Sequence, residues 1–331
     1  MDTAHAQPAG SQTRLHCAEH AGGGYDADIS ECRTAVSARE GLDYIAHVTC
    51  GVFDFAVEAT LSRAAGPETT DAFDRAVRQL SLVVAQLDTA CEPLDSGPLI
   101  RVVLQGGNGA MFQVLKVPGQ TFFGLTLDGT PNTVDLADRR LAELAESAAR
   151  RIGAASLKWG GFRGAEHSDS GELWLPGLAA PDIAPFVTGQ DSTLPDVTVE
   201  ACRRALHRAD LHYIAVYRLG QPSWCADIFD DPALRAFFQR VTPMDRRKGY
   251  TRLIGHVTLQ ARRLSHLLTL VRSDLLVRLV LDVARGAIYV LPLNEDDYLV
   301  GVTLNQARVE QADRKIRALH GQLWPRAASL E

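Results

Sequence analysis

Apolar and polar residues recur along the chain with two different periods. In residues 70–90 the apolar side chains return every three or four positions, which predicts an amphipathic helix. They are Phe73, Val77, Leu80, Val84 and Leu87. Residues 99–104, 110–117 and 121–127 are instead short runs rich in β-branched and aromatic residues, separated by turns that contain Gly or Pro. This pattern is typical of three consecutive strands.

The same order of elements is predicted twice. The first set is a helix at 29–39, strands at 42–48 and 52–61, a helix at 70–90, strands at 99–104, 110–117 and 121–127, and a helix at 134–152. The second set is a helix at 198–208, strands at 211–218 and 223–229, a helix at 249–272, strands at 275–283, 286–292 and 298–304, and a helix at 308–323. An insertion at 230–247 adds a short helix near 233–238. The sequence therefore predicts the α+β class, as two tandem α-β-β-α-β-β-β-α modules, each a five-stranded, mostly antiparallel sheet with helices on its faces.

An internal repeat supports this interpretation. When the chain is displaced by 177 residues, Leu99-Ile100-Arg101-Val102-Val103-Leu104 falls on Leu276-Val277-Arg278-Leu279-Val280-Leu281. Nine of 30 positions are identical in this ungapped block. With small gaps, Ala137-Asp138-Arg139 matches Ala312-Asp313-Arg314, and Cys32-Arg33 matches Cys202-Arg203. Matches that keep the same order across the whole module indicate a tandem duplication.

The predicted modules occupy residues 29–152 and 198–325. Residues 1–28 are rich in Ala, Gly, His and Gln and are predicted to be a disordered N-terminus. They lack the pattern of a signal peptide, and no apolar run approaches the length of a membrane span. Residues 153–197 are rich in Gly, Pro, Ser and Asp and are predicted to be a linker, part of which packs on a module through its tryptophans.

Composition narrows the range of functions. The chain has 331 residues, a net charge of −6 and an ordinary apolar content of 46%, so it carries no overall basic charge for nucleic acid. Its six cysteines form no Cys-x-x-Cys pair, and we expect reduced thiols in a cytoplasmic protein.

The sequence contains no strong catalytic, cofactor or metal motif, so we expect a protein that is not an enzyme. The Gly-rich segment Gly106-Gly107-Asn108-Gly109 lies between two predicted strands and lacks the lysine and the following helix of a phosphate loop, which indicates a hairpin turn. His47 and Cys50 are close in sequence, but their spacing places them on opposite faces of a strand. Glu295-Asp296-Asp297 is predicted to be a solvated hairpin tip.

The element order and the second half of each copy resemble the roadblock (dynein light chain) family. The resemblance rests on a strand, a Gly turn, two further strands and a helix that carries Ala137-Asp138-Arg139 or Ala312-Asp313-Arg314. It implies a scaffold or interaction protein whose modules pair through the central helix and a neighbouring strand, forming one sheet across two modules. It also implies a small Ras-like GTPase, or a signalling or polarity complex, as the partner. Two copies in one chain would form an intramolecular pseudo-dimer, and a homo-oligomer is a further possibility.

Charge differs between the two predicted central helices. The second helix and its lead-in are basic, whereas the equivalent region of the first is acidic. Opposite charges on equivalent helices would favour pairing of unlike modules. The candidate interaction surface consists of Asp71, Asp74, Arg78, Arg252, Arg262 and Arg263.

Three alternatives stay open at this point. A small-ligand sensor of the PAS or GAF type would need polar residues on the inner face of the sheet, whereas these strands are rich in aliphatic residues. An acidic protein that resembles secretion chaperones would fit the pI of 5.9 but has a different element order. An enzyme is the third.

Overall fold

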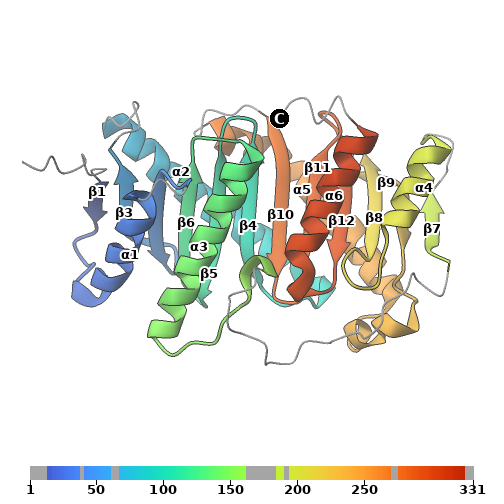
Figure 1. Cartoon of the computed structure of the whole chain (residues 1–331), viewed down its shortest axis with the longest axis horizontal. Coiled ribbons are helices and arrows are strands. Elements are labelled where there is room, and N and C mark those ends of the chain that lie inside the picture. The colour runs from blue at the N-terminus through green and yellow to red at the C-terminus, as the bar shows by residue number, and fades with distance from the viewer. Residues whose placement is uncertain are drawn as a thin grey trace, which may run out of the picture.

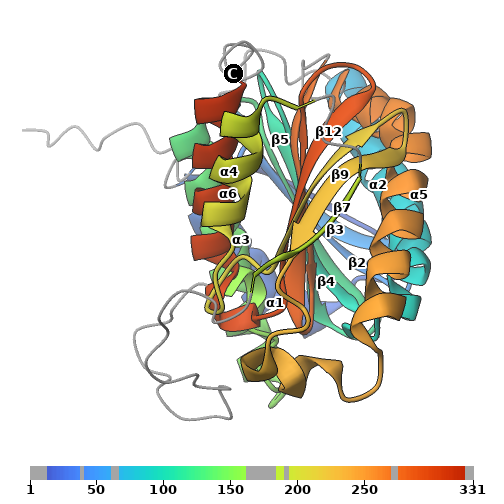
Figure 2. The ribbon, with the colours of Figure 1, turned by 90° about the vertical axis from the view of Figure 1, so that its right-hand side faces the viewer.

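A computed structural model describes residues 13–37, 41–60, 67–161, 184–189, 194–269 and 275–324. Its centre is a single antiparallel sheet of twelve strands, with helices on both faces (Figure 1). In the view along the sheet, α2 and α5 cover one face, and α1, α3, α4 and α6 cover the other (Figure 2). The chain therefore folds into three layers, consistent with the predicted α+β class.

The elements of the N-terminal half follow the predicted order closely. They are α1 (Asp26–Ser37), β2 (Tyr44–Thr49), β3 (Val52–Ala59), α2 (Pro67–Cys91), β4 (Leu99–Gly106), β5 (Ala110–Val117), β6 (Gln120–Thr126) and α3 (Pro131–Arg151). The long helices α2 and α3 both have a proline in their first turn, where its missing N–H is not needed.

The elements of the C-terminal half come in the same order. They are α4 (Asp196–Ala205), β8 (Tyr213–Arg218), β9 (Gln221–Asp227), α5 (Pro243–Thr269), β10 (Leu276–Val283), β11 (Gly286–Pro292), β12 (Asp297–Thr303) and α6 (Val309–Leu323). The short helix predicted in the insertion is the 3-10 helix η5 (Pro232–Phe238). The other 3-10 helices of the described residues are η1 (Gly23–Tyr25), η2 (Glu92–Leu94), η3 (Trp159–Gly161) and η6 (Gln306–Arg308).

The sheet is continuous, where the sequence predicted two separate five-stranded sheets. The strand order is β1-β3-β2-β6-β5-β4-β10-β11-β12-β8-β9-β7. The strands of the two halves meet at β4 and β10, which pair antiparallel at the middle of the sheet. Local periodicity predicts strands but not which distant strands will be neighbours, so this junction could not be read from the pattern alone.

Two edge strands correct the predicted boundaries. β1 (Thr13–Cys17) pairs with β3, and η1 and the start of α1 follow it, so residues 13–28 are not a disordered terminus. β7 (Phe186–Gly189) pairs with β9 inside the predicted linker. Residues 1–12 and 162–183 lie outside the described residues.

Both faces of the sheet bury apolar side chains. One core lies beneath α1, α3, α4 and α6, and the other lies beneath α2 and α5. All eight residues of β4 are buried, because helices cover both of its faces. The central strands consequently read as nearly continuous apolar runs, as the sequence shows.

Two glycines allow the same close packing in the two halves. A Cβ at Gly124 would lie 2.9 Å from Leu141 and 3.0 Å from Leu42. A Cβ at Gly301 would lie 2.9 Å from Ile316 and 3.2 Å from Leu211. Each glycine therefore lets a helix of the outer layer approach its strand to closer than ordinary contact distance.

Candidate interaction surface

The two halves join along β4 and β10 in a definite register. Val103 lies opposite Val280, and Arg101 lies opposite Asp282. Val103 and Val280 are also 177 residues apart, the displacement that aligns the two copies of the sequence. Equivalent residues that face each other in this way define a local two-fold axis between the halves.

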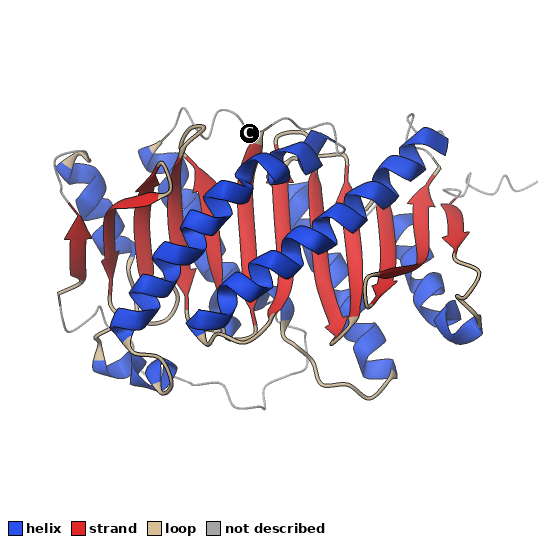
Figure 3. Ribbon diagram, turned by 180° about the vertical axis from the view of Figure 1, so that it is seen from behind, coloured by secondary structure: helices blue, strands red, loops and turns tan. Residues whose placement is uncertain are grey.

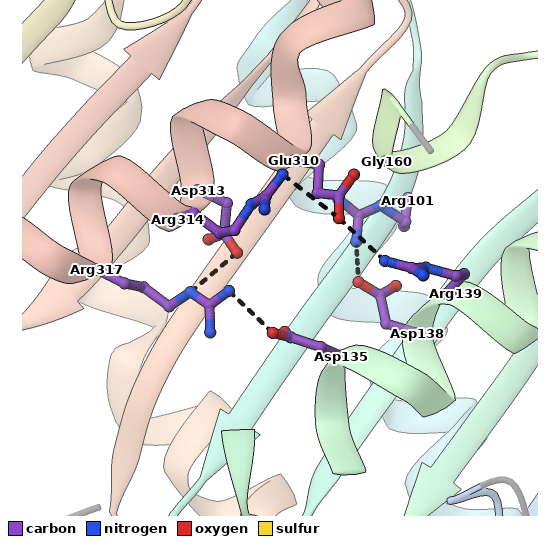
Figure 4. A pocket seen from close by; sticks show the side chains of 9 residues that line it. All are labelled: Arg101, Asp135, Asp138, Arg139, Gly160, Glu310, Asp313, Arg314 and Arg317. Atoms are coloured by element: carbon purple, nitrogen blue, oxygen red, sulfur yellow. Dashed lines mark hydrogen bonds and ion pairs between the residues drawn. The ribbon is translucent and has the colours of Figure 1, made fainter. Parts of the chain in front are cut away.

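A buried ion-pair network lies beside this axis, between α3 and α6 (Figure 4). The Arg101 guanidinium donates to Asp138 of α3, and its Nε donates to Asp282 Oδ2 of β10 at 2.9 Å. Burial lowers the pKa of Arg101, but the charges of Asp138 and Asp282 more than offset this effect and raise it overall. Arg101 therefore stays charged and ties the first half to the second.

An equivalent arginine makes the matching contacts from the other half. Arg278 Nη1 donates to Asp313 Oδ2 at 2.5 Å, and its Nη2 donates to Asp135 Oδ1 at 3.3 Å. Arg317 of α6 reaches the other oxygen of Asp135 at 2.9 Å. The pairs Arg101–Asp138 and Arg278–Asp313 thus join the same two positions of the repeat in each half.

The beginning of the predicted linker reinforces the junction. The Gly160 backbone N–H donates to Asp282 Oδ2 at 2.7 Å, and the Trp159 indole donates to the Leu115 carbonyl at 2.7 Å. The Gln306 side-chain amide donates to the Lys158 carbonyl at 2.9 Å. These few residues contact both halves, so they position the halves as well as connecting them.

This junction encloses only a small cavity, of about 50 Å³. Its lining combines basic and acidic side chains that already contact one another (Figure 4). Within the described residues, no group of three or more His, Cys, Asp or Glu side chains could hold a metal ion. The space suits a few water molecules, and the balanced charges suit a structural role.

The opposite face presents the paired central helices α2 and α5, which lie side by side across the sheet (Figure 3). The two helices meet where the Arg246 Nη2 donates to the carbonyl of Leu94, which follows α2, at 2.8 Å. No described element covers the outer side of this pair (Figure 2). We call this outer side the helix-pair face.

The predicted interaction residues all lie on α2 or α5. Asp71, Arg78, Arg252 and Arg263 are exposed. Asp74 is half-buried and accepts a hydrogen bond from the Tyr44 hydroxyl at 2.7 Å. Arg262 lies in α5, but its side chain is outside the described residues.

The contacts shown by these side chains are local. Arg78 Nε donates to the Asp74 carbonyl at 3.4 Å, and Arg263 Nη1 donates to Gln260 Oε1 at 3.2 Å. The ion pairs described above between the halves involve α3, α6, β4 and β10 instead. Attraction between the two central helices therefore stays a hypothesis, while the exposed charges are available to a partner.

Sequence reasoning missed two leucines on the helix-pair face. Leu82 of α2 is 68% exposed, and Leu259 of α5 is 79% exposed. They are 177 residues apart, so they occupy equivalent positions of the repeat. Extending the repeat alignment through the central helices would have revealed them as apolar residues outside the buried stripe.

The cysteines do not form a nucleophilic site in the described structure. His47 is buried with its Nδ1 2.8 Å from Asp54 Oδ2, whereas Cys50 lies exposed in the following turn. All six cysteines are free thiols. Burial raises the pKa of Cys91 and of Cys202 to about 12, which keeps both protonated and inert near neutral pH.

Sequence comparisons add no family assignment. No family model and no curated protein matches the chain. No helix among the described residues is long and apolar enough to cross a bilayer.

Proposed function

We propose that the chain is a non-enzymatic interaction protein built from two diverged copies of a roadblock-like module, paired within one polypeptide. The observation that carries this proposal is the direct pairing of Val103 with Val280 at equivalent positions of the repeat. Two copies that meet around a local two-fold axis are expected of an intramolecular pseudo-dimer. The resemblance in element order implies the same arrangement of strands and central helices.

Further equivalences support a duplicated module. Gly124 and Gly301 contact side chains at matching positions, and Arg101–Asp138 has its counterpart in Arg278–Asp313. Packing and polar contacts both repeat, although the sequence between these positions has diverged. A shared origin of the two halves accounts for this combination more simply than independent selection of each contact.

The proposed activity is binding of a small Ras-like GTPase, or of a subunit of a signalling or polarity complex, on the helix-pair face. That face is uncovered by described elements, and it displays equivalent exposed leucines. The small-ligand alternative has less support, because apolar side chains fill both faces of the sheet. Free thiols on both buried and exposed cysteines suit the cytoplasm.

The test is retention of a GTPase by the immobilised full chain. Lysate from the source cells is applied in parallel with GDP and with a non-hydrolysable GTP analogue, and bound proteins are identified by mass spectrometry. We expect a Ras-like GTPase to be retained in one nucleotide state and to bind again after purification. Failure to retain any such GTPase in either state, while a different ligand or cargo is recovered, would contradict the proposal.

A further inference from the structure

The helix-pair face has near two-fold symmetry in some positions and not in others. Leu82 matches Leu259, and Arg75 matches Arg252, and all four side chains are exposed. These shared positions give the face two similar halves. A partner that used only them could bind equally well in two opposite orientations.

Other equivalent positions make the two halves of this face different. Asp71 of α2 corresponds to Lys248 of α5, and Gln86 corresponds to Arg263. All four of these side chains are exposed. The α5 half thus gains positive charge at two positions where the α2 half is acidic or neutral, in a protein whose net charge is −6.

The α5 half also gains apolar surface at its flank. The β8–β9 hairpin approaches α5 so closely that a Cβ at Gly255 would lie 3.6 Å from the Gly220 carbonyl. The neighbouring Leu219 is 76% exposed at the tip of this hairpin. At the corresponding positions the first half has Arg78 in the helix and Cys50 in the hairpin.

Resting on the proposed function, we propose that one partner protein lies across α2 and α5 in a single orientation, with an acidic surface against the α5 half. The apolar centre of that partner surface contacts Leu82 and Leu259, and its carboxylates meet Lys248, Arg252 and Arg263. Charge complementarity fixes orientation and speeds encounter, whereas the buried leucines supply most of the affinity. The divergence of the two halves makes the complex one partner to one chain.

A protein partner fits this face better than a lipid surface does. A helix that binds a membrane surface turns a continuous apolar stripe towards the bilayer. Here the apolar stripe of α5 is buried against the sheet, as Leu253, Val257 and Leu264 show. The exposed leucines are separated by polar residues, which suits the pockets of a folded partner.

The first test maps the orientation by photo-cross-linking. The full chain carries p-benzoylphenylalanine in place of Leu82 or of Leu259, is expressed in the source cells and is irradiated there. We expect both positions to capture the same partner through two different peptides, the one from position 259 being rich in Asp and Glu. Capture of one and the same partner peptide from both positions, or no capture at either position, would overturn the proposal.

The second test reverses charge on the two faces of the protein. Lys248→Glu with Arg263→Glu should lower the cross-linking yield from position 259 roughly tenfold at low salt, and less at high salt. Arg204→Glu with Arg314→Glu makes the same change in net charge on exposed residues of α4 and α6, and should leave the yield unchanged. An equal loss in both variants would contradict a specific acidic contact.

Two further outcomes separate the possible explanations. Co-sedimentation with vesicles containing phosphatidylglycerol, abolished by Lys248→Glu with Arg263→Glu, would replace the protein partner by a membrane. A cross-linked partner that is no GTPase would sink the proposed GTPase function but keep the docking geometry. A retained GTPase that cross-links to neither leucine position would do the reverse.

Discussion

Val103 of β4 lies directly opposite Val280 of β10 in the strand pair that joins the two halves of the sheet. Both side chains are buried in the core beneath α3 and α6. Because the two residues occupy the same position of the repeat, every contact near them has a counterpart on the other side of the junction. The ion pairs, glycine contacts and exposed leucines described above follow this relationship, and their departures from it distinguish the halves.

The ion pairs at the junction should differ greatly in their contribution to stability. Arg101→Met leaves Asp138 and Asp282 buried without their guanidinium partner, which should cost about 3–5 kcal/mol. Arg139→Met removes a pair with Glu310 in which Arg139 is 51% exposed, and should cost less than about 1 kcal/mol. Urea unfolding of both variants measures the difference. Similar losses in the two variants would show that burial does not govern this network.

The two equivalent glycines should respond alike to a methyl group. Gly124→Ala and Gly301→Ala each place a Cβ 2.9 Å from a core side chain, so each should destabilise by roughly 1–3 kcal/mol. Gly321→Ala is the matched control, because a Cβ there has nothing within 4 Å in helix α6. It should stabilise the protein by about 0.5–1 kcal/mol. Thermal or urea unfolding would contradict this prediction if one core glycine tolerated alanine and the other did not.

His212 should make the fold sensitive to acid. Its Nε2–H donates to the Arg208 carbonyl at 2.9 Å, and its Nδ1 accepts from the Leu304 N–H at 3.1 Å, so the buried ring is neutral. Burial lowers the pKa of His212 to about 4 from its usual 6.5. The unfolded chain therefore binds the proton more readily, and stability should fall by roughly 3 kcal/mol as the pH drops from about 6.5 to about 4.

The variant His212→Asn isolates this effect. The asparagine carbonyl can accept from Leu304 but does not titrate in this range. We expect the variant to be less stable at pH 7 and to lose the part of the pH dependence that belongs to His212. The free energy of unfolding in urea at pH 7, 5.5 and 4.5 provides the comparison. An unchanged slope would assign the acid sensitivity to other groups.

The helices and most strands could be predicted from the sequence, because their apolar periodicity is strong. The predicted helix 70–90 is Pro67–Cys91, and the predicted strand 110–117 is Ala110–Val117. The edge strands β1 and β7 escaped prediction because they are only five and four residues long and are incompletely buried. A short strand with little apolar character owes its structure to the strand beside it.

The candidate site could be predicted in part. The charged residues of the central helices were identified from their sequence, and those described are exposed or half-buried on α2 and α5. Their partners within the fold were not predictable, since Arg101 and Asp282 are brought together only by the pairing of β4 with β10. Leu82 and Leu259 were predictable in principle, because the repeat aligns them and neither falls on the buried stripe of its helix.

The most direct measurement concerns the junction at Val103 and Val280. The full chain carries Val103→Cys and Val280→Cys, with the exposed Cys17 and Cys50 replaced by Ser, and is oxidised at low protein concentration. Intact mass, free-thiol titration and non-reducing electrophoresis then report which thiols have joined. We predict a disulfide within one chain, with two fewer free thiols and no covalent dimer. Disulfides formed only between chains would contradict an intramolecular pseudo-dimer.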